Sequence, residues 1–278
     1  MSSTVADSWS VSSVRHWPGM RSEYSRLPPH DYVTVTKPGQ IGVSFTNHSN
    51  VVQERDGRAA VLDVAAGMVF ATGAQPVTWA QVHDPTEVVE IYPDQELLQA
   101  AAASSQAGRV EIEPVSGARD ATVLGIAAVL KRAHVHGIDL GDVYASTLAH
   151  RLAEHVLTTY CGLGEVRRQP AGRLDRVLLE RVTALIDARL GETLTLGDLA
   201  GAAGLSPFHF ARVFRASTGM APHQFVTMRR MERAKTLLLA TALSVEQIAF
   251  GLGFSNLSHF RRTFRRYTGF APSDLRAR

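Results

Sequence analysis

Two short arginine-rich segments near the C-terminus carry the residues best suited to binding a polyanion. Arg212 and Arg215 lie in the first segment, and Arg262, Arg265 and Arg266 lie in the second. A guanidinium group can pair with both acceptors of a guanine edge and can also neutralise phosphate. We therefore predict that Arg212 and Arg262 contact DNA bases. Arg215, Arg265 and Arg266 are expected to contact phosphate or to remain solvated.

The two segments belong to a pattern that occurs twice. Leu194, Ala200, Gly204 and Ser206 recur 49 residues further on, and nine residues between His209 and Pro222 recur 50 residues further on. Thirteen identities in register indicate an internal duplication of one structural unit. The change of spacing places a one-residue insertion where the last helix of the second copy begins.

Each copy has the pattern of a helix-turn-helix motif. In the first copy, a short apolar-periodic helix over 196–203 is followed by Gly204, which suits a left-handed residue at a helix end. Ser206 then provides an N-cap and Pro207 the first position of a second helix, which Gly219 ends. The second copy repeats these features, so two motifs are expected.

A connecting helix is expected between the two motifs. Residues 222–240 carry apolar side chains at helical spacing, and this length corresponds to about 28 Å of helix. Major grooves on one face of DNA repeat every 34 Å or so. The two recognition helices are therefore expected to enter successive grooves, with some DNA bending or incomplete entry of one helix.

Three stretches of the second copy carry a specific family pattern: IAFGLGFS at 248–255, HFRRTFRR at 259–266 and GFAP at 269–272. With them, residues 174–278 resemble the DNA-binding domain of AraC/XylS-family transcription regulators. The resemblance implies that two motifs read promoter DNA. By position in the motif it implies base contacts from Phe208, Ala211 and Arg212 in the first recognition helix and from Ser258, His259 and Arg262 in the second. Phe208 and Ala211 offer no hydrogen bonds, so the first helix is expected to read thymine methyl groups and DNA shape.

The first 95 residues predict strands. Short alternating stretches are separated by turn signals such as Pro38-Gly39 and Asp56-Gly57, which is typical of a small barrel or sandwich. The stretches 56–58 and 67–73 resemble, more weakly, the cupin-like sensor domain of many such regulators. That resemblance implies a small-molecule effector site inside a β-barrel. Four aromatic residues are candidates for its lining, although a barrel core needs aromatic residues in any case: Phe45, Phe70, Trp79 and Tyr92.

Helical periodicity replaces alternation after Pro93. A short helix is predicted over 97–103 and two longer amphipathic helices within 120–160. By the same resemblance, these longer helices supply the interface of a homodimer. The expected fold class is α+β. It comprises a cupin-like ligand-sensing domain (1–115), a helical dimerisation segment and linker (116–172) and an all-α DNA-binding domain with two helix-turn-helix motifs (173–278).

The net charge of +3 is distributed unevenly over the 278 residues. From Arg173 onward the chain carries a balance of +8, whereas the first 172 residues carry −5. The basic part is therefore expected to meet DNA and the other part to have a different role. The single cysteine, Cys161, excludes an internal disulfide framework. No secretory signal and no apolar run of about 18 residues is found, so we expect a cytoplasmic protein without a membrane span.

Catalytic motifs are absent from the sequence: there is no nucleophile elbow, no dinucleotide-binding fingerprint and no Walker loop. His134 and His136 form a His-x-His pair, but it lies on a predicted helix end with no glutamate close behind it. We therefore expect no catalytic residue, no metal and no cofactor. Two alternatives stay open: a cupin-type enzyme with an accessory basic domain, and a non-specific architectural DNA binder.

The sequence thus predicts a sequence-specific transcription regulator. Its expected partners are promoter DNA, a small-molecule effector and a second copy of the chain. RNA polymerase is a further partner if the protein activates transcription.

Overall fold

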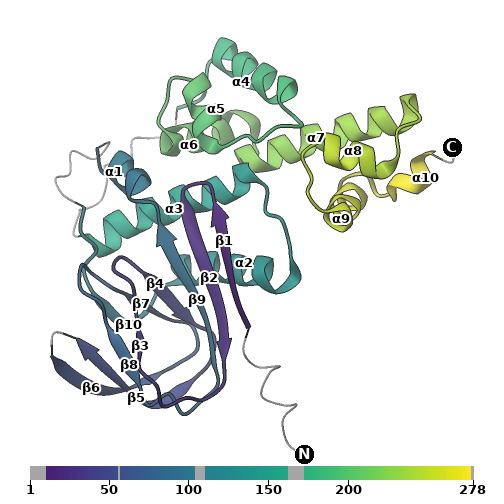
Figure 1. Cartoon of the computed structure of the whole chain (residues 1–278). Coiled ribbons are helices and arrows are strands. Elements are labelled where there is room, and N and C mark those ends of the chain that lie inside the picture. Colours follow the sequence, from purple (N-terminus) through teal and green to yellow (C-terminus); the bar gives the residue numbers. More distant parts are fainter. Residues whose placement is uncertain (1–10, 56, 104–109, 162–171, 277–278) are drawn as a thin grey trace, which may run out of the picture. The chain divides into compact units, whose positions relative to one another are not determined.

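The computed structural model describes residues 11–55, 57–103, 110–161 and 172–276. Its helices and strands form two compact units (Figure 1). The N-terminal unit comprises residues 1–136 and 149–168, and the C-terminal unit comprises residues 137–148 and 169–278. The fold is mixed: the N-terminal unit holds the sheets and three helices cover parts of it, while the C-terminal unit is helical.

The strands of the described residues form two sheets, with strand orders β1-β2-β9-β4-β7-β10 and β3-β8-β5-β6. All strand pairs among the described residues are antiparallel. The bounds are β1 Val11–Trp17, β2 Met20–Leu27, β3 Thr34–Val35, β4 Ile41–Ser44, β5 His48–Arg55, β6 Arg58–Val64, β7 Met68–Ala71, β8 Thr78–Ala80, β9 Thr86–Pro93 and β10 Val115–Arg119.

The two sheets meet through side chains rather than through a continuous strand ladder. Phe70 on β7 and Trp79 on β8 pack edge to face, with their ring centroids 5.0 Å apart. Within the described part of the chain, no ladder closes the sheets into a single cylinder. The sequence left a barrel and a sandwich open, and the closed cupin-like barrel is not what these strands form.

The β1–β2 hairpin was not expected from the sequence. It turns at Pro18-Gly19, where Gly19 has a φ of +86°. A Cβ atom at Gly19 would lie 2.9 Å from Leu97 Cδ2 and 3.1 Å from Ala149 Cβ. Glycine is therefore required here both for the left-handed backbone and for the close packing of the turn.

Three helices complete the N-terminal unit: α1 (Gln95–Ala103), α2 (Ala121–His136) and the second half of α3 (Asp142–Tyr160). The helix α2 packs on β9, β2, β4 and β7, burying Val123, Ile126 and Leu130. The division between the units falls inside α3, between Leu148 and Ala149. The predicted linker over 162–172 lies outside the described residues except for Gly172.

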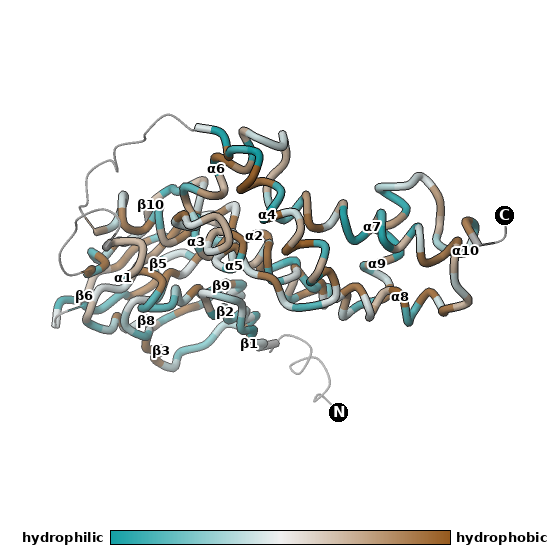
Figure 2. The backbone as a smooth tube through the Cα atoms, turned by 90° about the horizontal axis from the view of Figure 1, so that it is seen from above, coloured by the Kyte–Doolittle hydropathy of each residue, from teal (hydrophilic) through white to brown (hydrophobic). Residues whose placement is uncertain are grey.

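Seven helices form the rest of the C-terminal unit: α4 (Arg176–Ala188), α5 (Leu196–Ala202), α6 (Pro207–Thr218), α7 (Pro222–Ala240), α8 (Val245–Gly251), α9 (Leu257–Thr268) and α10 (Pro272–Arg276). In Figure 2 hydrophobic and hydrophilic residues follow one another along these helices, as expected when one face of each is buried. The buried faces share four fully buried rings: Phe210, Phe214, Phe260 and Phe264. The helix α7 confirms the predicted connection between the motifs.

The turns of both motifs follow the predicted pattern, with one difference. Gly204 and Gly253 both have positive φ values, of +66° and +73°. Ser206 caps α6 and accepts a bond from the backbone N–H of His209, as predicted. In the second motif the cap of α9 is Asn256 rather than Ser255. The inserted residue therefore releases Ser255 from capping, and its hydroxyl is free to bond elsewhere.

No helix in the described ranges combines the length and apolar character that a membrane crossing requires.

Candidate nucleic-acid interface and ligand cavity

The helix α6 divides into a buried and an open face. Phe210, Val213 and Phe214 are buried in the core of the C-terminal unit. Arg212 and Arg215 are exposed. The helix contains no acidic residue, so its open face is cationic.

The helix α9 repeats this division with more charge. Phe260 and Phe264 are buried, and the 50-residue offset places Arg262 and Arg265 where α6 has its two arginines. Among the described residues, none of the α6 or α9 arginines forms an ion pair, whereas Arg229 on α7 binds Asp187 with Nε 2.7 Å from Oδ1. The arginines of α6 and α9 therefore keep their donors available to an external anion.

A third position on each open face follows from helix geometry. Residues at i, i+3, i+4 and i+7 share one face of a helix. In α6 these positions are 208, 211, 212 and 215, and in α9 they are 258, 261, 262 and 265. Arg261 is exposed and occupies the place of Ala211, so the structure adds it to the candidate contacts. The repeat spacing was the signal that would have identified it in the sequence.

Three of the four remaining predicted base contacts are half-buried. Phe208 and Ala211 are half-buried, and Ala211 packs against the core. Ser258 is exposed, but His259 is half-buried with its ring 5.7 Å from that of Phe254. Burial lowers the pKa of His259, against the opposing influence of Asp139. His259 thus packs against Phe254 with its neutral form favoured, and its contact with a base stays a prediction.

Arg230 on α7 bonds the segment between α4 and α5 and lies beside Gly253 in the turn of the second motif. Its Nε donates to the carbonyl oxygen of Leu190 at 2.8 Å, and its Nη2 donates to that of Glu192 at 3.1 Å. A Cβ atom on Gly253 would lie 2.9 Å from Nη2. Burial lowers the pKa of Arg230, and Asp142 and Asp139 oppose this shift. Arg230 is thus a structural cation rather than a DNA contact.

Asp139 is a polar contact of the turn before α9 that sequence reasoning missed. Its Oδ2 accepts a bond from the Ser255 hydroxyl at 2.5 Å, and its Oδ1 accepts one from the backbone N–H of Gly141 at 2.9 Å. Burial favours a raised pKa for this carboxyl, but the bonds from Ser255 and Gly141 outweigh it and hold the pKa below the usual value. A carboxylate thus sits beside the start of a cationic helix.

A cavity of about 190 Å³ lies between the two sheets of the N-terminal unit. Its middle is apolar, with Phe70, Trp79 and valines from both sheets among its lining: Val51, Val64 and Val88. Of the four predicted aromatic residues, Phe70 and Trp79 line it. Phe45 instead lies under the Lys131 ammonium, with Nζ 4.3 Å from the ring centroid. Tyr92 is likewise absent from the lining of this cavity.

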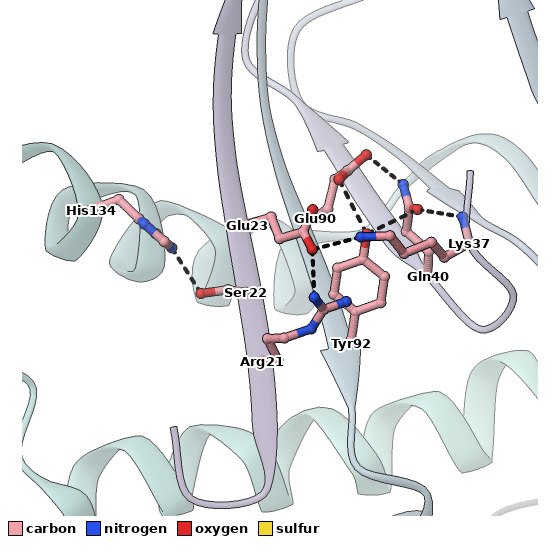
Figure 3. A network of polar contacts seen from close by, with 8 residues as sticks. All are labelled: Arg21, Ser22, Glu23, Lys37, Gln40, Glu90, Tyr92 and His134. Carbon is pink, nitrogen blue, oxygen red and sulfur yellow. Dashed lines mark hydrogen bonds and ion pairs between the residues drawn. The ribbon is translucent and has the colours of Figure 1, made fainter. Parts of the chain in front are cut away.

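Glu90 lies in the cavity wall at the edge of a polar network (Figure 3). Its Oε1 accepts a bond from Gln40 Nε2 at 2.6 Å, and its Oε2 accepts one from the Tyr92 hydroxyl at 3.2 Å. Burial, followed by the nearby Glu23 carboxylate, raises the pKa of Glu90. Both oxygens of this carboxyl group are therefore occupied by protein donors. Lys37 compensates Glu23, with Nζ 2.8 Å from Oε1.

His134 does not take part in a metal site. Its ring bonds two serine hydroxyls, with Nδ1 2.7 Å from Ser13 Oγ and Nε2 2.9 Å from Ser22 Oγ. Burial, and then the charge of Arg15, lowers the pKa of His134 to about 4. In the described part of the chain, no three His, Cys, Asp or Glu side chains are grouped so that they could hold a metal ion.

Comparison with known proteins identifies the C-terminal unit by its sequence. Residues 199–278 match a family model described as a helix-turn-helix domain. The chain is 28% identical over 246 residues to the transcriptional activator NphR of Rhodococcus, covering 88% of this chain and 69% of NphR. The C-terminal part of the chain is therefore a helix-turn-helix domain of the AraC type, and the chain is similar to transcription regulators over most of its length.

Other transcription regulators match over about a third of this chain. The probable transcriptional regulator LumQ of Photobacterium leiognathi is 32% identical over 101 residues, which is 36% of this chain and 40% of LumQ. An AraC-type transcriptional regulator structure from Chromobacterium violaceum is 31% identical and covers 37% of this chain and 91% of its own, with a TM-score of 0.36. The chain thus spans 40% of LumQ but more than two thirds of NphR.

Proposed function

We propose that this AraC/XylS-family regulator reads two successive major grooves of promoter DNA through α6 and α9 and changes its DNA affinity when a small molecule binds the N-terminal unit. One observation carries the DNA-binding part. The two helices present arginines at matching positions, contain no acidic residue and are joined by one helix, α7. A solvated surface without a partner has no reason to repeat this arrangement.

The length of α7 supports the reading of two grooves. Met231, Ala234 and Leu238 bury one face of α7 in the core shared by both motifs. Its 19 residues correspond to about 28 Å, somewhat less than the 34 Å or so between successive major grooves. The difference favours a bent DNA or a shallower position for one helix.

Substitution of Arg212 and Arg262 tests the DNA-binding proposal. The wild-type protein would first select binding sites from a random DNA library, and the affinity of each variant for a selected site would be measured by fluorescence anisotropy. Arg212→Ala and Arg262→Ala are each expected to cost about 1–3 kcal/mol of binding free energy and to relax the preference at one base position.

The matched control is Arg176→Ala. Arg176 is exposed and pairs with Glu180 on its own helix, so its loss changes the net charge by the same amount away from α6 and α9. Wild-type affinity in both Arg212→Ala and Arg262→Ala would refute the assignment of the two helices. Equal affinity of the wild type for selected and random DNA would favour a non-specific architectural role instead.

The cavity supports the effector part of the proposal. It lies between both sheets and has a predominantly apolar lining with a few polar groups, as small-molecule sites usually do. A ligand alters DNA binding only if it binds one conformation of the chain better than another. The test is the affinity for a selected DNA site with and without a ligand that raises the Tm of the protein.

The homodimer is also part of the proposal, through α2 and α3 or their neighbours. Within one chain α2 already buries Val123, Ile126, Ala127, Leu130 and Ala133, so the partner must use the other face, where Val135 is 49% exposed. Sedimentation equilibrium of the wild type and of Val135→Glu measures the association. Retention of a dimer in the variant would place the interface elsewhere.

A further inference from the structure

The polar atoms of the cavity have an unusual property: several of them lack a protein partner. Among the described residues, four buried side-chain atoms form no hydrogen bond: His48 Nδ1, Arg55 Nε, Thr86 Oγ1 and His223 Nδ1. The first three belong to residues that line the cavity between the sheets. A buried donor or acceptor without a partner costs about 1–3 kcal/mol. Their concentration around one cavity is therefore best explained by a ligand that bonds them.

The strand register separates these atoms into two groups. Val51, Gln53 and Arg55 alternate along β5 and share the side that faces the cavity. Glu54 is opposite Thr78 in the ladder with β8, so Arg55 comes next to Val77. His48 is at the other end of β5, where its Nε2 lies 3.1 Å from Thr46 Oγ1. The backbone N–H of Glu87, next to Thr86, donates to that same Thr46 oxygen.

The cavity therefore has a cationic end at Arg55 and a neutral polar end at His48 and Thr86. Burial is the main cause of a lowered pKa at His48, so its imidazole is uncharged near pH 7. The rings of Phe70 and Trp79 also line the cavity. The charge that a ligand must match is thus that of Arg55.

Glu90 is the one carboxylate in the lining, and its position argues against an amine ligand. Both of its oxygens already accept bonds, from Gln40 and Tyr92. Arg55, in contrast, forms no ion pair with any described residue. The unmet bonding capacity of the cavity is therefore that of a cation and not that of an anion.

The volume limits the size of the ligand. An apolar cavity of about 150 Å³ holds benzene, and this cavity measures about 190 Å³. The cavity therefore accommodates a six-membered ring, and the additional volume accommodates a short acid side chain on that ring. Edge-to-face geometry at Phe70 and Trp79 also offers favourable packing to an aromatic or branched aliphatic body.

We infer that the cavity binds a small carboxylic acid with an apolar body, its carboxylate held by Arg55. This inference rests on the proposed effector function and specifies the chemistry of the effector. An arginine–carboxylate pair is a charge-assisted and frequently bidentate interaction, which makes it the main determinant of specificity in such a site.

Calorimetric titration of the full-length protein tests the inference with matched probes. The acids are benzoate, phenylacetate, 4-hydroxyphenylacetate and hexanoate, and each is compared with its uncharged amide and with an amine of the same shape. We expect at least one acid to bind with a Kd below about 1 mM. The corresponding amide is expected to bind about 10- to 100-fold more weakly, since a hydrogen bond to a charged group is lost.

Arg55→Met is expected to reduce acid binding by the same factor, and Arg55→Lys by less, because lysine keeps the charge but loses the planar fork. Arg58→Met is the matched control. Arg58 is opposite Arg55 in the same hairpin but is exposed and absent from the cavity lining. Wild-type acid binding by a folded Arg55→Met variant, or preference for an amine over its acid, would overturn the inference.

The outcome for DNA binding is separate. If an acid binds through Arg55 but leaves the affinity for a selected DNA site unchanged, the ligand class stands and the proposed effector response fails. If an amine or a neutral ligand binds and changes DNA affinity, the effector response stands and the carboxylate inference fails. If no acid binds at all, the inference fails whatever the protein does with DNA.

Discussion

Removal of the three arginines expected to contact phosphate should change the salt dependence of DNA binding more than its sequence preference. Arg215, Arg265 and Arg266 are exposed, and none of them forms an ion pair among the described residues. Each phosphate contact contributes about 0.9 to the slope of log K against log salt concentration. Loss of all three should therefore reduce the slope by about 2.7.

This slope predicts a large difference in a simple assay. Between about 50 and 200 mM salt, a change of about 2.7 in slope corresponds to a roughly 40-fold smaller loss of affinity in the triple alanine variant than in the wild type. Fluorescence anisotropy on a selected site, at five or more KCl concentrations, measures both slopes. Arg229→Ala is the control, because Arg229 is already paired with Asp187. An unchanged slope in the triple variant would refute the placement of these arginines on the phosphate backbone.

Three further predictions concern the two cores and the Asp139 contact. Phe264→Ala should lower the free energy of unfolding of the C-terminal unit by about 3–5 kcal/mol, since Phe264 is fully buried. Phe264→Leu should lower it by much less. Urea unfolding followed by circular dichroism measures both losses, and equal losses would contradict the packing. Burial, followed by the bond to Glu87, raises the pKa of Tyr24 to about 12. The stability that the neutral Tyr24 side chain contributes is therefore complete below pH 10 and is lost as the pH rises toward 12. In Tyr24→Phe this part of the alkaline decline in Tm should disappear. Asp139→Asn keeps an acceptor for Ser255 but removes a negative charge beside α9. The DNA affinity of this variant should therefore rise at low salt and converge with that of the wild type at high salt. Reduced affinity at low salt would show that the charge itself is needed.

The C-terminal unit was the more predictable part because its signals are local. The turn glycines, the serine cap and the periodic phenylalanines each depend on residues a few positions apart. Gly204 and Ser206 have the conformations expected of them. The position of Arg261 was also present in the repeat spacing, whereas the contact of His259 with Phe254 cannot be inferred from the sequence.

The N-terminal unit was less predictable because its structure depends on distant pairing. Ser22 is fully buried in β2, where it bonds His134 and Trp17, so the strand does not show an alternation of apolar and polar residues. The turn signal Pro18-Gly19 could have identified this hairpin, but its place beside β9 could not. Whether strands close into a barrel depends on pairing between strands far apart in the chain, which composition does not reveal.

The same limit applies to the cavity. Phe70 and Trp79 were candidates because they are aromatic, but nothing in the sequence distinguished them from Phe45, which packs under Lys131. Arg55 was not a candidate, since an arginine next to an Asp-Gly turn is ordinarily a surface residue. Its significance arises from a buried Nε atom without a partner, which only the structure reveals.

The helix α3 has a consequence for how this chain tolerates insertions. Val143 and Ser146 belong to the C-terminal unit. Val143 lies in its core, and the Ser146 hydroxyl accepts a bond from the backbone N–H of Leu196. Leu152 and Val156 are instead buried in the N-terminal unit. Each residue added to a helix rotates everything beyond it by about 100°. One extra residue after Leu148 would thus turn one set of these side chains out of phase with the other, whereas seven would nearly restore it. The number of residues in α3 therefore fixes the rotational phase between its side chains that belong to one core and those that belong to the other.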